Sequence, residues 1–229
     1  MTQQPTISID SKTKEKAEPK KVAIFGGSFD PIHFGHLTPV FDAVTQFDIG
    51  KLIYLPCYKQ PLKNSCATKS HHRLNMCKLA LASVHSPIPT EISEFELEQM
   101  GNSYTINTLK YFKQLEPNTE FYFIVGMDSL LSFTQWVEWQ NILEVCHLIV
   151  MARPQYKLQL DIQENTTTQP TLAPVLIPFL GKRIHIVENA LIDISSTEIR
   201  QAFKNDDADR LQDWLPQQVA AYIQNNQLY

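Results

Sequence analysis

The sequence predicts an α/β fold: a Rossmann-like, mainly parallel sheet with helices on both faces. Short, continuous apolar runs recur along the chain, as expected for strands that are buried on both faces. Segments with helical periodicity separate these runs, which favours right-handed crossovers and parallel strand pairing. At 229 residues, the chain is long enough to bury the core of one such domain.

The predicted elements follow one another as strand and helix. The first strand is an apolar run, residues 22–25, that ends at a pair of glycines. Further strands are expected at residues 52–55, 121–125, 147–151 and 184–187, with a more polar, strand-like segment at 92–97. Helices are expected at residues 35–46, 72–84, 105–115, 136–143, 196–204 and 216–226. Ligands should therefore bind in the loops beyond the carboxyl ends of the strands.

Two segments lack this pattern. Residues 1–19 are polar with little to bury, which predicts a disordered leader before a single domain at residues 20–229. Residues 155–180 are rich in Gln, Thr and Pro, and we expect a mobile surface excursion there, with room for one short helix.

Composition excludes several classes of protein. Hydrophobic residues make up 43%, charged residues 19% and the net charge is −4, with no basic stripe of the kind that a nucleic-acid binder carries. The four cysteines form no C-x-x-C pair, so they are predicted to be reduced packing residues. No secretory signal and no apolar run of membrane-spanning length is present, so we expect a cytoplasmic protein without a membrane partner.

The first candidate site is residues 26–36, here called the first phosphate loop. Gly26 and Gly27 let the backbone approach a phosphate, and Ser28, Phe29 and Gly35 complete the turn into a helix whose free N–H groups attract anions. Two imidazoles three residues apart can donate hydrogen bonds to oxygens that gain charge in phosphoryl transfer; they are His33 and His36. For Asp30, a local turn or cap role is expected.

The second candidate site is residues 194–200, here called the second phosphate loop. Ser195 and Glu198 have capping-box spacing, which predicts a fixed helix start with exposed N–H groups. The hydroxyls of Ser196 and Thr197, with Arg200 one turn later, could then hold a triphosphate. Capping boxes also occur on helices that bind no ligand, so the prediction of a phosphate site here depends on the presence of the first phosphate loop.

The two loops resemble the signatures of the nucleotidyltransferase superfamily that carries the H-x-G-H motif. The resemblance rests on two segments: Gly27-Ser28-Phe29-Asp30-Pro31 with His33-Phe34-Gly35-His36, and Ile194-Ser195-Ser196-Thr197-Glu198-Ile199-Arg200. The resemblance implies a Rossmann-like fold, transfer of a nucleoside monophosphate with release of pyrophosphate, and contacts from His33 and His36 to ATP. The G-x-G-x-x-G pattern of dinucleotide-binding dehydrogenases is absent.

The middle of the chain resembles bacterial nicotinate-nucleotide adenylyltransferases, over about residues 20–229. The resemblance implies that backbone N–H groups near Tyr104, with Thr105, and near Val137 receive the nicotinate carboxylate. Trp136 could stack on the pyridine ring or be a core residue. Asp128 could bind a ribose hydroxyl of ATP, cap the next helix, or do both.

One loop departs from the family pattern. Relatives usually carry P-P-H-[KR] after the second strand, where this chain reads Gln60-Pro61-Leu62-Lys63. Lys63 is kept as a candidate phosphate contact, and the histidine is replaced by leucine. Nearby, the His71-His72-Arg73 run could add positive charge or form a solvated helix start.

The expected reaction is transfer of AMP from ATP to nicotinate mononucleotide in NAD biosynthesis, with His33, His36 and Arg200 as catalytic residues and Mg²⁺ carried by ATP. Another acceptor, nicotinamide mononucleotide or phosphopantetheine, stays open, as does a nucleotide sensor without turnover. An aminoacyl-tRNA synthetase fragment is disfavoured by length and by the lack of a lysine-rich second signature. The sequence leaves a homo-oligomer open.

Overall fold

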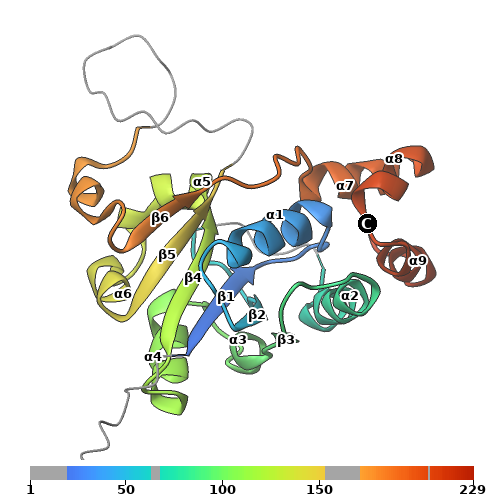
Figure 1. The fold of residues 1–229 in the computed structure, drawn as a ribbon. Helices are drawn as coiled ribbons and strands as arrows, with labels where there is room; N and C mark the ends of the chain where they lie inside the picture. The colour runs from blue at the N-terminus through green and yellow to red at the C-terminus, as the bar shows by residue number, and fades with distance from the viewer. Residues whose placement is uncertain (1–19, 63–67, 153–170, 206) are drawn as a thin grey trace, which may run out of the picture.

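The computed structural model describes residues 20–62, 68–152, 171–205 and 207–229. Its centre is a six-stranded sheet in the order β3-β2-β1-β4-β5-β6, and all neighbouring strands are parallel (Figure 1). The strands are β1 (Lys21–Gly27), β2 (Lys51–Pro56), β3 (Thr90–Ile92), β4 (Glu120–Gly126), β5 (Cys146–Met151) and β6 (Ile184–Val187). The order reverses between β1 and β4, as in doubly wound sheets. The predicted fold class is confirmed.

The helices follow the strands in the expected alternation. They are α1 (Phe34–Thr45), α2 (Ser70–Ser83), α3 (Phe95–Glu98), α4 (Thr105–Leu115), α5 (Met127–Leu131), α6 (Trp139–Val145), α7 (Ser196–Lys204), α8 (Ala208–Trp214) and α9 (Gln217–Asn225), with the 3-10 helices η1 (Phe133–Gln135) and η2 (Pro174–Phe179). In the described part of the chain, no helix combines the length and apolarity needed to cross a bilayer.

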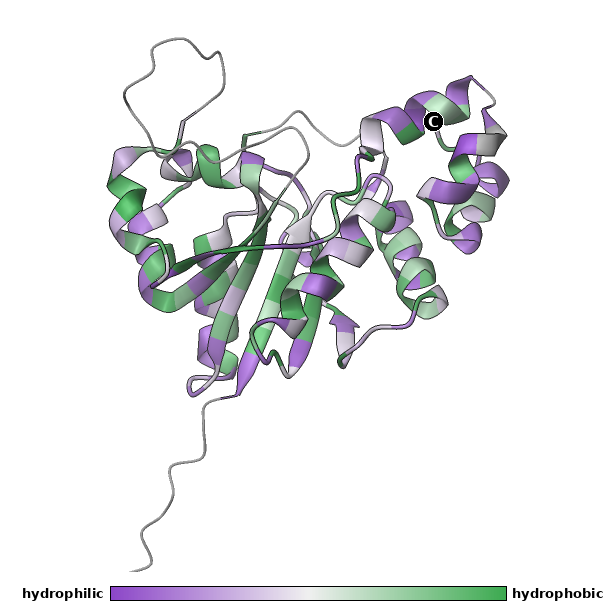
Figure 2. Cartoon of the chain, turned by 45° about the horizontal axis from the view of Figure 1, so that its top comes forward, coloured by the Kyte–Doolittle hydropathy of each residue, from purple (hydrophilic) through white to green (hydrophobic). Residues whose placement is uncertain are grey.

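The sheet separates two hydrophobic cores. In β1, Ala23 and Phe25 face one core while Val22 and Ile24 face the other, because successive side chains of a strand point to opposite faces. The first core is covered by α1, α2, α7, α8 and α9, and the second by α4, α5, α6 and the 3-10 helices. Figure 1 shows α1 crossing one face of β1, and Figure 2 shows apolar strands at the centre of the molecule. Burial on both faces explains the continuous apolar runs in the sequence.

The segment expected to be strand-like at residues 92–97 is only partly strand. β3 ends at Ile92, and Phe95 and Leu97 lie in α3. The Phe95 ring stacks on Tyr111 of α4 at a centroid distance of 3.9 Å and an interplanar angle of 12°. This packing against α4 overrides the alternating apolar pattern on which the prediction was based.

A second correction concerns the helix expected to contain Trp136. Trp136 is extended, with φ −74° and ψ 142°, between η1 and α6. Glu138, the residue before α6, has a left-handed φ of 53°, so the chain turns sharply before the helix begins at Trp139. The short helices α5 and α8 were not among the predicted elements.

The expected surface excursion at residues 155–180 divides at residue 171. Residues 153–170, like the predicted leader 1–19, lie outside the described residues. Residues 171–180 contain η2, and Leu172 and Leu176 are buried in the second core. The 3-10 helix η2 is the short helix for which the prediction left room. Leu172 and Leu176 anchor this part to the core, while Val175 and Ile177 are exposed.

The cysteines that the structure describes are packing residues, as predicted. Cys57, Cys77 and Cys146 are buried free thiols. Burial raises the pKa of Cys77 and of Cys146, so both sulfurs are held as inert thiols. Cys66 lies outside the described residues.

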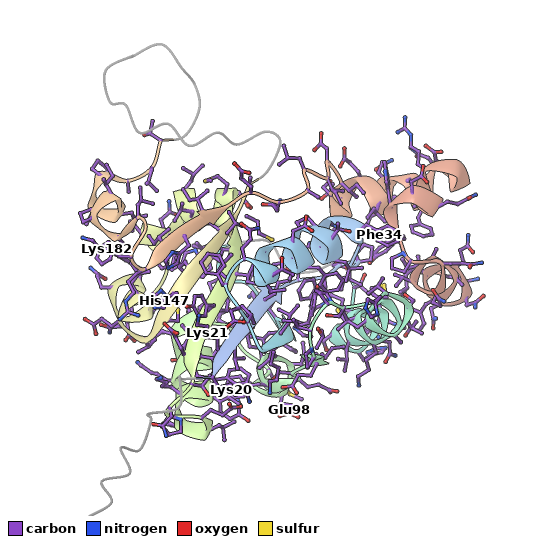
Figure 3. The ribbon with its side chains drawn as sticks, viewed as in Figure 1. Lys20, Lys21, Phe34, Glu98, His147 and Lys182 are labelled. Carbon is purple, nitrogen blue, oxygen red and sulfur yellow. The ribbon has the colours of Figure 1, made fainter. Side chains whose placement is uncertain are left out.

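A polar cluster lies at the end of the sheet where the strands begin. His147 Nδ1 is 3.0 Å from His185 Nε2, and Arg183 Nη1 is 3.0 Å from His147 Nε2. Glu120 Oε1 lies 3.1 Å from the same Nε2, so this ring nitrogen lies between a guanidinium, which only donates, and a carboxylate, which accepts. Figure 3 places His147 toward the end of the molecule marked by Lys20 and Lys21, away from Phe34 at the start of α1.

This cluster makes the stability of the fold sensitive to acid. Burial, followed by the Arg183 charge, lowers the pKa of His147, and burial also lowers the pKa of His185. The unfolded chain therefore binds more protons than the native state as the pH falls through about 6.5, the ordinary histidine value. We expect the free energy of unfolding, measured by urea titration, to fall between pH 7.5 and pH 5.5.

A variant without the titrating ring should weaken this dependence. His147→Gln should have a flatter pH profile of unfolding free energy than the wild type, whereas His85→Gln, at an exposed histidine outside the cluster, should keep the wild-type profile. Identical pH profiles of unfolding free energy for His147→Gln and the wild type would contradict the assignment of the acid sensitivity to this cluster.

Candidate active site

One cavity of about 720 Å³ lies at the carboxyl ends of β1 and β4. The strand order reverses there, and this is where parallel sheets bind ligands. Lys63 lies outside the described residues, and Gly35 is not part of the lining. The other predicted site residues all line this cavity: Gly26, Gly27, Ser28, Phe29, His33, His36, Tyr104, Thr105, Asp128, Trp136, Val137, Ser195, Ser196, Thr197 and Arg200.

The first phosphate loop needs a glycine where it leaves β1. A Cβ atom on Gly27 would lie 2.9 Å from Cε1 and Cζ of Phe29, closer than real side chains pack. The Phe29 ring fills this space: the residue is only 1% exposed, and its ring packs edge-on against Phe25 and His36. Phe29 also adopts a left-handed φ of 49°, which is uncommon for a residue with a side chain. Strained backbone of this kind clusters at functional sites.

The two histidines of the first loop lie against each other. Their ring centroids are 3.7 Å apart at an interplanar angle of 32°, and both rings line the cavity. His33 is the N-cap residue of α1 and is only 3% exposed. A Cβ atom on Gly35 would lie 2.9 Å from His33 Nδ1, so the glycine makes room for the ring. This spacing places two adjacent imidazoles at the start of a helix, where an anion is favoured.

Asp30 lies in a turn, as expected, and its side chain and carbonyl also make long-range contacts that the sequence did not predict. Its side chain is buried, and Oδ2 accepts from the Thr68 backbone N–H at 3.3 Å. Oδ1 accepts from the Tyr229 hydroxyl at 2.8 Å. Burial and the neighbouring Asp30 carboxylate raise the pKa of Tyr229 above its ordinary value, so the hydroxyl stays a donor. The Asp30 backbone carbonyl accepts from Arg200 Nη1 at 2.7 Å.

The second phosphate loop begins α7 with the predicted capping box. Ser195 accepts from the Glu198 backbone N–H, and the Glu198 side chain accepts from the Ser195 N–H, so the helix start is fixed. Ser196 Oγ donates to the Pro31 carbonyl at 3.0 Å. Arg200 Nη2 donates to Thr197 Oγ1 at 3.1 Å, while its other terminal nitrogen holds Asp30. The two phosphate loops, far apart in sequence, are therefore bonded to each other.

The opposite side of the cavity carries the residues predicted for the acceptor. Tyr104 is the N-cap residue of α4, and its neighbour Thr105 begins that helix. Trp136 is half-buried and borders the cavity while its ring packs edge-on against Phe123. Val137 is 48% exposed. Trp136 therefore packs on the core and also borders the cavity, so stacking on an acceptor ring stays a prediction.

Asp128 lies in the first turn of α5, and the N-cap residue of that helix is Gly126. The alternative that Asp128 caps the helix is therefore wrong. A carboxylate in a helix first turn is stabilised by the helix dipole. Its position on the cavity leaves the predicted contact with a ribose hydroxyl sterically open.

Leu62 also lines the cavity and is 55% exposed. It stands at the position where the P-P-H-[KR] pattern described above has a histidine. An aliphatic side chain has no hydrogen-bond donor, so the Leu62 side chain cannot replace the contact that a histidine would make.

The structure defines the roles of two further residues. For Arg73 a solvated helix start is wrong, because the residue is 1% exposed; the alternative of an added positive charge stays open, and Nη1 donates to the Ser28 carbonyl at 2.6 Å. Glu96 is buried at the cavity and accepts from Thr108 Oγ1 at 2.6 Å. Burial raises the pKa of Glu96 above its ordinary value, against the opposing effect of that bond. The sequence does contain a signal for Glu96, a carboxylate between the apolar residues Phe95 and Leu97. The strand-like pattern predicted for this segment hid the helix to which Glu96 belongs.

Comparison with known proteins gives a consistent result. The Cytidylyltransferase-like family matches residues 24–202, a range that includes both phosphate loops. The "Probable nicotinate-nucleotide adenylyltransferase" of Shewanella frigidimarina is 34% identical over 217 residues, covering 91% of this chain and 99% of the relative. The protein of the same name from Clostridium tetani is 32% identical over 211 residues, covering 92% of this chain and 99% of the relative.

A solved structure has the same fold. Plasmodium falciparum nicotinic acid mononucleotide adenylyltransferase complexed with NaAD matches with a TM-score of 0.73 at 24% sequence identity, covering 92% of this chain and 97% of that chain. The match extends the resemblance in fold over nearly the whole length of both proteins.

Proposed function

Because the chain belongs to the nicotinate-nucleotide adenylyltransferases of the cytidylyltransferase-like family, we propose that it transfers AMP from ATP to nicotinate mononucleotide. The products are nicotinate adenine dinucleotide (deamido-NAD) and pyrophosphate, in NAD biosynthesis. One observation carries this function: a single cavity is lined on one side by two bonded phosphate loops and on the other by an aromatic acceptor segment.

The proposed chemistry is an in-line displacement at phosphorus. A 5′-phosphate oxygen of nicotinate mononucleotide attacks the α-phosphorus of ATP, and the bond from that phosphorus to the bridging oxygen breaks. The electron pair of this bond leaves with pyrophosphate. A phosphate monoester is already largely a dianion at neutral pH, because its second pKa is about 6, so no side chain has to remove a proton. The protein contributes positioning and charge stabilisation.

The phosphate loops supply the groups for this task. His33, His36 and Arg200 donate hydrogen bonds to the triphosphate as its charge moves toward the leaving pyrophosphate. The backbone N–H groups at the start of α7, including those of Ser196 and Thr197, bind the phosphates from the other side, while the Ser196 hydroxyl donates to the Pro31 carbonyl. Free helix N–H groups and cationic side chains thereby surround the triphosphate.

The acceptor side supplies orientation. The Trp136 ring stacks on the flat pyridine ring, and backbone N–H groups near Tyr104 and Val137 receive the carboxylate. Asp128 binds a ribose hydroxyl of ATP, and Lys63 contacts the acceptor phosphate. Together these contacts orient the 5′-phosphate of the acceptor and the α-phosphorus of ATP toward each other.

Mg²⁺ enters this scheme as part of the ATP substrate. In the described residues, no three His, Cys, Asp or Glu side chains are grouped so as to hold a metal ion. Mg²⁺ commonly keeps several waters while it binds substrate phosphates, and on ATP it neutralises part of the triphosphate charge.

We also propose that the enzyme is cytoplasmic.

The proposed function is tested by pyrophosphate release from Mg²⁺-ATP with three acceptors offered separately. We expect turnover with nicotinate mononucleotide to exceed that with nicotinamide mononucleotide or phosphopantetheine by at least about tenfold in kcat/KM, equivalent to about 1.4 kcal/mol of discrimination. Preference for one of the other acceptors would contradict the acceptor assignment. Silence with all three, in a folded protein that binds ATP, would instead indicate a nucleotide sensor.

A further inference from the structure

Arg73 connects the first phosphate loop to two other segments of the chain. It lies in the first turn of α2 and is 1% exposed. Its guanidinium donates to three backbone carbonyls: from Nη1 to Ser28 at 2.6 Å, from Nε to Thr68 at 3.3 Å and from Nη2 to Tyr58 at 3.3 Å. A planar group with donors on all sides suits such a junction, which a lysine could not reproduce.

Two guanidinium groups lie behind the loop. Arg73 is bonded to neutral carbonyls, and the salt bridges between described residues do not include it. Arg200 is the second, bonded to the Asp30 carbonyl, while the Asp30 carboxylate accepts from the Thr68 N–H. Two more carboxylates, Glu96 and Asp128, line the same cavity. Burying the charge of Arg73 is costly unless an opposite charge compensates it, and a polyphosphate in the cavity would supply such a charge.

The bond to Ser28 also sets a direction. The Ser28–Phe29 peptide is trans, so its C=O and N–H point to opposite sides. With the carbonyl fixed on Arg73, the Phe29 N–H points away from the guanidinium. Ser28 and Phe29 both line the cavity. The left-handed φ of Phe29 matches the backbone conformations that form anion-binding concavities.

We propose that Arg73 is a positioning residue for ATP, which holds the Ser28 carbonyl so that the loop presents its N–H groups to the phosphates and which adds a buried positive charge behind them. This inference rests on the proposed function insofar as it takes ATP as the ligand of the first phosphate loop. The proposal predicts that replacing Arg73 weakens ligand binding more as the number of phosphates on the ligand rises, because binding of the adenine and ribose does not depend on this charge.

The test compares the binding of adenosine, AMP and ATP by calorimetry, without acceptor, to the wild type and to Arg73→Met and Arg73→Lys. For Arg73→Met we expect the affinity for ATP to fall by at least about tenfold, the affinity for AMP to fall less, and the affinity for adenosine to stay at the wild-type value. Arg73→Lys should recover part of the loss, since it restores the charge without the three-way hydrogen bonding. Lys78→Gln, an exposed position on the same helix, is the matched control for the loss of one charge and should bind all three ligands normally.

Two outcomes would overturn the proposal: unchanged ATP affinity in Arg73→Met, or equal losses for adenosine and ATP, which would indicate only structural damage. If Arg73→Met does not fold, Arg73→Lys decides, because the proposal requires a severalfold loss for ATP with normal adenosine binding. Turnover of the wild type with nicotinate mononucleotide is measured in parallel. A wild type that binds ATP without making dinucleotide would refute the proposed function, while a phosphate-dependent loss in the variants would still support the role of Arg73.

Discussion

Replacement of His33 by alanine is expected to lower kcat by about 10²–10³, the usual effect of removing one preorganised donor from a site where charge develops. The ring is held in place before any substrate arrives, since it is 3% exposed and lies 3.7 Å, centroid to centroid, from the ring of His36. A donor that needs no reorganisation stabilises the transition state more than the ground state. The loss should therefore appear in kcat, with a smaller change in the KM for ATP.

The matched variants separate this role from packing. His33→Asn keeps a side-chain N–H donor and should lie between alanine and the wild type in kcat. His85→Ala, at an exposed histidine, should have wild-type kinetics. Steady-state pyrophosphate release measures kcat and KM separately, and thermal unfolding shows whether each variant is folded. A folded His33→Ala protein with wild-type turnover would remove His33 from the proposed mechanism.

The parts of the site that the sequence predicts correctly depend on local signals. The first phosphate loop follows from an apolar run, two glycines and a helix start, all within 15 residues of chain (22–36). The capping box of Ser195 and Glu198 is likewise a contact between residues three positions apart. The parallel strand order then brings both loops to one edge of the sheet, because carboxyl ends of parallel strands share that edge.

The parts that escaped prediction depend on contacts across the chain. Asp30 pairs with Tyr229, 199 positions away, and Arg73 pairs with Ser28, 45 positions away. Residue type alone favours a local turn for an aspartate before proline and a solvated surface for an arginine at a helix start. Only the packing of α2 against the first phosphate loop converts Arg73 into a buried group. Glu96 was missed for a related reason, since the packing of α3 on α4 overrides its strand-like pattern.

The fold shows the same division. Strands buried on both faces produce apolar runs that are read without ambiguity, as in β4. Short helices such as α5 and α8 have too few turns to show a period of 3.6, so periodicity does not reveal them. In η2 the composition is dominated by proline and aliphatic residues, and only the burial of Leu176 identifies this segment as part of the core.

The second large effect is expected at Arg200, which joins the two phosphate loops. Arg200→Met should lower kcat/KM by about 10³, slightly more than the loss of one neutral donor, since a charged group is removed and the Asp30 carbonyl loses its partner. The KM for ATP should rise as well, because the residue is proposed to contact the triphosphate in both the ground state and the transition state. Arg210→Met, at an exposed arginine of α8, is the control for charge and should leave kinetics unchanged.

The geometry of Arg200 predicts how much a lysine can restore. Nη1 reaches Asp30 at 2.7 Å while Nη2 reaches Thr197 Oγ1 at 3.1 Å, a forked arrangement that one ammonium cannot reproduce. Arg200→Lys should therefore remain at least about tenfold below the wild type in kcat/KM. In a double-mutant cycle, Thr197→Val should cost less in the Arg200→Lys background than in the wild type, because the bond that it removes is already weakened. Strictly additive losses would mean that Arg200 acts on the phosphates independently of Thr197, and full activity of Arg200→Lys would mean that only its charge is used.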